Sequence, residues 1–142
     1  MTHRFLLLGA MLTVGCASTP RGPSDATLAQ QLQQRVEAAI PDAQARVAIF
    51  APDARLTIIG LPGADGAPTT LDLTGTDQIR AFTTQTPLPP GFAMEFLNFE
   101  RKGAQFAQTG RWRITGATGT FTVSWREIDG RWLVSLWQMR TP

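Results

Sequence analysis

The chain has 142 residues, with 13 Lys or Arg against 11 Asp or Glu, which gives a formal net charge of +2. Its only histidine and its only cysteine, His3 and Cys16, lie in the first 16 residues, and it has no tyrosine. The remainder therefore lacks the side chains for an intrachain disulfide, a zinc site of the usual Cys/His type, or a Ser–His or Cys–His nucleophile.

Residues 1–15 have the pattern of a lipoprotein signal peptide. Arg4 precedes an apolar run that is shorter than a transmembrane helix, which needs about 20 apolar residues. The run closes with Thr13-Val14-Gly15-Cys16, which resembles the lipobox of bacterial lipoproteins, although that family usually has Leu, Val or Ile at the position of Thr13. In the family, the cysteine is lipidated and the peptide is cut just before it. The alternative is a buried cysteine near the start of a cytosolic domain.

The lipobox resemblance implies that lipidated Cys16 anchors the protein to a membrane. Residues 16–24 are small, polar and proline-bearing, so they predict a flexible linker between the anchor and the domain. Ala17 follows the cysteine where the family's inner-membrane retention signal has Asp. The resemblance therefore implies a location in the cell envelope, on the periplasmic face of the outer membrane.

Residues 25–142 are enough for one domain with a core of its own. The clearest helix signal covers residues 24–41, where Ser24 or Asp25 can cap the start and Pro41 ends the helix. The apolar residues recur every four positions and form one stripe: Leu28, Leu32, Val36 and Ile40.

The next segments alternate between extended and helical patterns. Residues 45–60 predict a short helix or extended piece, followed by a strand. After a loop rich in Gly and Pro, residues 69–73 predict a short strand. Residues 74–85 predict a second long helix, with Thr76 as its cap.

From Phe92 onward the apolar period changes from four residues to two, which is typical of strands. Turn-like segments, the last of them with Asp129-Gly130, divide this region into four strands. Alternation places the aromatic residues of each strand on one face. The pattern predicts an antiparallel meander whose aromatic face is covered by the helices, which is an α+β fold of two layers.

Three segments in this order resemble the nuclear transport factor 2-like superfamily, especially its polyketide-cyclase-like branch: "FAPDARL" (50–56), "LTGTDQIRAF" (73–82) and "REIDGRWLVSLWQM" (126–139). The resemblance implies a cone-shaped, cystatin-like fold, in which a curved antiparallel sheet wraps over N-terminal helices and leaves a pocket at its open end. It also implies dimers that form through the outer face of the sheet.

Enzymes of that family use a pocket His or Asp for proton transfer, and their last strand often carries inward-facing histidines. Leu136 and Gln138 align with those positions here, so a general base would have to be a carboxylate with a raised pKa. Strand alternation directs Glu95 outward, and Glu100 lies at a strand end. Asp53 remains the catalytic candidate, against the plainer interpretation of a turn or capping residue.

The ligand-binding candidates are Trp112, Trp125, Leu136 and Gln138. The two tryptophans share the core face of their strands, and with Gln138 as the orienting polar group they could line a pocket for an apolar molecule. The alternative is that the tryptophans fill the space under the helices. The outer face of the sheet is expected to be apolar, which predicts a homodimer or partner contact through Leu97, Phe99, Leu133, Trp137 and Met139.

Together these features favour a lipid-anchored envelope protein whose non-catalytic pocket domain binds an apolar small molecule or a protein partner. The alternatives are a lyase or isomerase of the polyketide-cyclase-like type with a carboxylate base, and a structural accessory of an envelope complex. Acidic residues are interleaved with the arginines, so no nucleic-acid partner is expected. No metal or cofactor is expected either.

Overall fold

The structure, a computed structural model, describes residues 22–142. The expected signal peptide, Cys16 and most of the expected linker lie outside the described residues. The elements follow one another as α1 (Asp25–Ala39), α2 (Ala43–Ala48), β1 (Phe50–Pro62), β2 (Pro68–Thr74), α3 (Thr76–Gln85), β3 (Ala93–Lys102), β4 (Gln105–Ile114), β5 (Ala117–Ile128) and β6 (Arg131–Arg140). None of the helices within residues 22–142 has the length and apolar character to cross a membrane.

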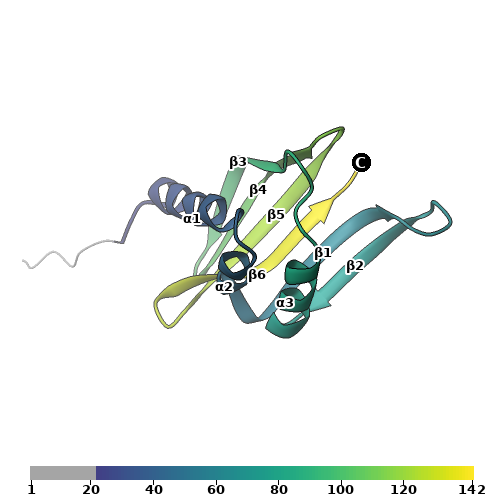
Figure 1. Cartoon of the computed structure of the whole chain (residues 1–142). Coiled ribbons are helices and arrows are strands. Elements are labelled where there is room, and N and C mark those ends of the chain that lie inside the picture. The colour runs from purple at the N-terminus through teal and green to yellow at the C-terminus, as the bar shows by residue number, and fades with distance from the viewer. Residues whose placement is uncertain (1–21) are drawn as a thin grey trace, which may run out of the picture.

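The six strands form one curved, open sheet in the order β2-β1-β6-β5-β4-β3. All neighbouring strands are antiparallel except β1 and β6, which run parallel. The helices cover one face of this sheet, and the β1–β2 hairpin extends beyond them (Figure 1). The expected α+β fold with a curved sheet over N-terminal helices is confirmed, and so is the meander of the last four strands.

The helices begin and end largely where local chemistry predicts. Ser24 caps α1 by accepting a hydrogen bond from the backbone N–H of Thr27 at 3.2 Å. Of the expected apolar stripe, Leu28, Leu32 and Val36 are buried, and Ile40, just beyond the end of α1, is half-buried. For α3, the expected cap is wrong. Gly75 occupies the capping position with φ 85°, a conformation that glycine adopts without strain, and Thr76 instead donates its hydroxyl to the carbonyl of Pro52 at 3.4 Å.

A β-bulge in β6 changes which side chains face the helices. Ser124 pairs with Leu136 while its neighbour Trp125 pairs with Val134, so Ser135 is an extra residue in β6. An extra residue moves every side chain beyond it to the opposite face, because strand side chains alternate. Trp137 therefore faces the helices, and the residues on either side of it face outward.

Four expected placements on β6 are wrong for this reason. Trp137 and Met139, expected on the outer face, pair with Val123 and Phe121 on the helix-covered face. Leu136 and Gln138, expected to face the pocket, pair with Ser124 and Thr122 on the outer face. Leu133, which precedes the bulge, pairs with Arg126 and keeps its expected outward direction.

A second bulge, in β3, has the same effect. The register shifts between Phe96 and Asn98, which leaves Leu97 as the extra residue. Beyond it, Phe99 lies on the helix-covered face and stacks on Phe106 with ring centroids 5.6 Å apart. The expected position of Phe99 on the outer face is wrong, although it lies on an edge strand and stays 46% exposed.

Candidate functional site

A cavity of about 90 Å³ lies between the helices and the part of the sheet where β1 and β6 run side by side. Its wall is almost entirely apolar. The lining residues come from the end of α1, from α2, β1, α3, the connection to β3, and β6: Ile40, Arg46, Phe50, Leu56, Ile58, Phe82, Thr83, Thr86, Leu88, Phe92, Trp137 and Met139.

The floor of the cavity is built by the parallel pair of strands. Phe50 at the start of β1 stacks on Trp137 of β6, with ring centroids 5.9 Å apart and an interplanar angle of 28°. Leu56 pairs directly with Trp137, and Ile58 pairs with Met139. The β6 bulge is what turns Trp137 and Met139 toward this floor, so the cavity depends on the irregularity of the strand.

Helix α3 and the segment after it form one side of the cavity. Phe82 and Thr83 lie on the face of α3 that meets the sheet, and Thr83 is buried. Pro87, Pro89 and Pro90 stand in the connection to β3, where proline's fixed φ and missing N–H prevent the helix from continuing. The connection therefore crosses the rim, where it contributes apolar side chains to the wall.

The indole N–H of Trp137 is the one polar group of the wall that is buried without a partner. Trp137 is only 6% exposed, and within residues 22–142 its Nε1 is the sole buried side-chain nitrogen or oxygen that has no hydrogen bond. A buried donor without an acceptor costs about 1–3 kcal/mol. The nitrogen has almost no accessible surface, so a molecule in the cavity contacts the indole ring of Trp137 and not its N–H.

Arg46 supplies the only charge in the wall. It projects from α2, and its Nη1 donates to the carbonyl of Ile40 at the end of α1. Partial burial lowers the pKa of the guanidinium, and the charge of Asp42 acts in the opposite direction. Across residues 22–142, no carboxylate lies within 4 Å of Arg46 as an ion-pair partner.

A wider surface groove, of about 460 Å³, continues from the cavity between the end of α1 and the connection to β3. Arg46 and Thr83 belong to both hollows, together with Ile40, Leu88 and Phe92. Arg46 therefore lies at the boundary between a partly open apolar cavity and a wider, more open groove.

Solved structures with the same arrangement of helices and sheet are similar over most of the chain. A nuclear transport factor 2-like protein of unknown function from Shewanella oneidensis has a TM-score of 0.60 and 18% identity, with 82% of this chain and 99% of that chain covered. The domain has the nuclear transport factor 2-like fold. At this level of identity the likeness establishes the fold alone.

Two further solved structures are similar to this chain in fold. A nuclear transport factor 2-like protein of unknown function from Pseudomonas putida has a TM-score of 0.63 and 17% identity, over 85% of this chain and 90% of that chain. A protein with a cystatin-like fold from Nostoc punctiforme has a TM-score of 0.59 and 15% identity, over 82% of this chain and 90% of that chain. No protein-family model and no curated protein sequence matches the chain.

The tryptophans expected to bind ligand lie away from the cavity between the helices and the sheet. Trp125 is fully buried and donates its indole N–H to Oε1 of Gln108 at 2.9 Å. Trp112 covers Gly119 so closely that a Cβ there would lie 2.4 Å from its ring, and its N–H donates to the carbonyl of Arg140 at 3.1 Å. Both indoles are satisfied by the protein, and neither lines the cavity that Trp137 floors.

All four residues predicted to bind ligand border other parts of the surface and not this cavity. Trp112 borders a surface hollow with Glu95, and Trp125 borders another with Leu136 and Glu100. Gln138 faces outward beside Thr122. A role in ligand binding for these residues stays a prediction, and so does a homodimer through the outer face.

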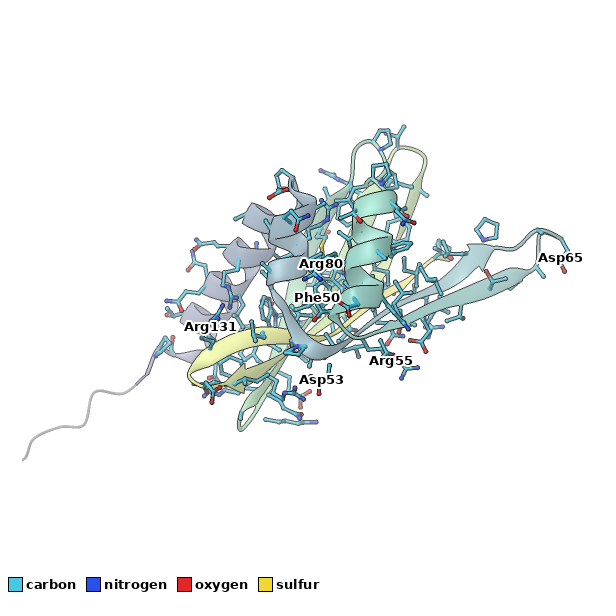
Figure 2. The ribbon with its side chains drawn as sticks, turned by 60° about the horizontal axis from the view of Figure 1, so that its bottom comes forward. Phe50, Asp53, Arg55, Asp65, Arg80 and Arg131 are labelled. Atoms are coloured by element: carbon cyan, nitrogen blue, oxygen red, sulfur yellow. The ribbon has the colours of Figure 1, made fainter. Side chains whose placement is uncertain are left out.

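Asp53 lies on the exposed side of β1, whereas Phe50 of the same strand faces the helices (Figure 2). Its side chain is 66% exposed and bonds to Arg126 at 2.6 Å. That hydrogen bond lowers the pKa of Asp53. A general base at neutral pH would need a shift in the opposite direction.

The cavity residues were missed by sequence reasoning because their signals are weak. Arg46 sits in a six-residue helix that the sequence left ambiguous, and Trp137 was assigned to the wrong face. No group of three or more His, Cys, Asp or Glu side chains in residues 22–142 is placed to hold a metal ion.

Proposed function

We propose that the chain is a lipid-anchored envelope protein whose nuclear transport factor 2-like domain binds a small apolar molecule in the cavity floored by Phe50 and Trp137. The observation that carries the proposal is the wall of the cavity, which is apolar except for Arg46, two threonines and the indole of Trp137. A ligand with an apolar body and an acceptor oxygen complements this wall, since Arg46 and the threonine hydroxyls can donate to that oxygen.

The size of the cavity is compatible with part of a small molecule. Water occupies about 30 Å³ per molecule in the liquid, so the 90 Å³ correspond to roughly three waters. Apolar cavities tend to stay dry and to accept apolar guests. The groove beyond Arg46 would receive the rest of a longer molecule.

Binding is favoured over the lyase or isomerase alternative by the composition of the wall. No Asp or Glu is among the lining residues, so no carboxylate is placed to take a proton from a molecule in the cavity. The hydroxyls of Thr83 and Thr86 have no neighbouring base in the wall that could activate them. The wall can therefore hold and orient a molecule, with no general base.

Binding is tested with 1-hexanol and benzene as probes, by calorimetry and by the rise in melting temperature that a ligand of the folded state produces. Thr86→Trp, at the exposed rim, should block entry and abolish both signals. Gln85→Trp, one residue earlier and outside both hollows, should bind as the unaltered protein does. Failure of both probes to bind the unaltered domain, with no small molecule retained in native mass spectrometry, would overturn the proposal.

The anchor is supported by the lipobox-like residues 13–16. Expression of the full chain in a bacterium fed a labelled fatty acid tests it. Label should enter the protein and vanish in Cys16→Ser, and Ala17→Asp should move the protein from the outer-membrane to the inner-membrane fraction. Unlabelled protein in the soluble fraction would exclude the anchor and leave the binding proposal standing.

A further inference from the structure

The polar groups around the cavity share one property, which is that they donate hydrogen bonds. The guanidinium of Arg46 is a donor only, and the hydroxyls of Thr83 and Thr86 can act either way. The wall contains no carboxylate, no Asn or Gln amide and no His. The complementary ligand therefore presents acceptors.

Arg46 adds a charge to this requirement. A guanidinium has five N–H donors, and the carbonyl of Ile40 takes a bond from Nη1. The nearest acid along the helix, Asp42, caps α2 by accepting bonds from the backbone N–H groups of Gln44 and Ala45 at 3.3 and 3.2 Å. Its carboxylate is thus committed to the helix start and does not form an ion pair with Arg46 within 4 Å.

The position of Arg46 sets the direction in which a ligand would lie. The guanidinium belongs to both the cavity and the groove, so an anionic head beside it remains near solvent. From that point an apolar tail reaches the apolar wall of Phe50, Phe82 and Trp137. A head in the cavity and a tail in the groove would bury the charge and expose the apolar carbons, which costs free energy twice.

We propose, on the basis of the proposed function, that the ligand is an apolar carboxylate whose head binds Arg46 and whose tail enters the cavity. A carboxylate accepts two parallel N–H bonds from a guanidinium, which no alcohol or ketone of the same length can do. The cavity thereby selects an anionic amphiphile over its neutral counterpart.

Octanoate and 1-octanol test this selection, because they share a chain and differ in the head. The unaltered domain should bind octanoate more tightly, and Arg46→Gln should weaken octanoate binding by about tenfold to a hundredfold, the range expected for charge-assisted hydrogen bonds. The same variant should change 1-octanol binding by less than about twofold. Arg80→Gln is the matched control, since Arg80 lies on α3 outside both hollows and pairs with Asp77.

The possible outcomes separate this inference from the proposed function. If octanoate and 1-octanol bind equally, or if Arg46→Gln weakens both alike while its circular dichroism is unchanged, the carboxylate assignment is wrong and apolar binding stands. If neither octanoate nor 1-octanol nor the hexanol and benzene probes bind, the proposed function itself fails. Should Arg46→Gln unfold, the comparison of the two ligands on the unaltered domain still decides between them.

Discussion

Gln108 joins Trp125 to helix α1 through the interior of the domain. Its Oε1 accepts the indole N–H of Trp125 at 2.9 Å, and its Nε2 donates to the carbonyl of Ala29 at 2.9 Å. Gln108 is 2% exposed, so each of these groups is removed from water and depends on the others. The two hydrogen bonds link α1 to the sheet through a core that is mostly apolar.

Replacing Gln108 with leucine should destabilise the domain by about 1–3 kcal/mol, because the substitution leaves the buried N–H of Trp125 without a partner and removes the side-chain bond to the carbonyl of Ala29. Urea denaturation followed by circular dichroism measures the change. Gln105→Leu is the control on the same strand, where the side chain is exposed, and it should shift stability by less than about 0.5 kcal/mol. Equal effects of the two substitutions would show that the network contributes nothing.

The two buried indoles of Trp125 and Trp137 should respond differently to phenylalanine. Each substitution removes the same atoms, but Trp125→Phe also deprives Gln108 of its donor, whereas the N–H of Trp137 has no acceptor to lose. We expect Trp125→Phe to be the more destabilising by about 1–3 kcal/mol. Chemical denaturation of both variants measures the difference. A larger loss for Trp137→Phe would mean that its N–H is already bonded in the free protein.

Much of the fold follows from local patterns that the sequence displays. The four-residue spacing of Leu28, Leu32 and Val36 requires a helix with one buried face, and the two-residue spacing after Phe92 requires strands. Both patterns arise from backbone geometry within one element, so the sequence alone contains them. The order of the elements then left few arrangements other than a sheet covered by helices.

The candidate site could not be derived in the same way, because a bulge is a property of two strands. Leu97 and Ser135 are extra residues only with respect to the registers of β4 and β5, and nothing in their local sequence marks them. The prediction assumed that side chains alternate without interruption along each strand, and it therefore placed Phe99 and Trp137 on the wrong face of the sheet. Arg46 was missed for a related reason. It lines a cavity together with residues at the end of α1 and on α3, and these segments come together only when the chain folds.

The pKa of Asp53 should rise when Arg126 is replaced by glutamine. The hydrogen bond from Arg126 is the main cause that holds this pKa below its ordinary value of 3.8. Carboxyl-carbon NMR titration of the unaltered domain and of Arg126→Gln measures the shift directly. Substitution of Arg111, which also points outward but does not pair with Asp53, serves as the control. An unchanged titration in Arg126→Gln would rule out the pair in solution.

The same ion pair predicts a small dependence of stability on pH. The folded pKa of Asp53 lies below the unfolded value, so the contribution of the ionised carboxylate is present above about pH 4 and is lost as the pH falls through the folded pKa. Asp53→Asn should therefore be less stable than the unaltered domain at pH 7 and equal to it in strong acid. The difference should shrink at high salt, because both side chains are solvent-accessible.

Arginine substitutions at neighbouring positions of β6 test the bulge at Ser135, on which the cavity depends. Trp137→Arg buries an unpaired charge in the floor of the cavity and should cost more than about 4 kcal/mol or prevent folding. Gln138→Arg places the charge on the outer face beside Thr122 and Thr57 and should change stability by less than about 0.5 kcal/mol. Thermal melting of the two variants, read by circular dichroism, gives both values.

A regular strand predicts the reverse order, because without the extra residue Gln138 would face the helices and Trp137 would face outward. Leu136→Arg extends the test, since Leu136 shares the outer face with Gln138 and should also be tolerated. A folded Trp137→Arg together with an unfolded Gln138→Arg would remove Trp137 from the cavity wall. The apolar floor on which the ligand proposal depends would then lack its indole.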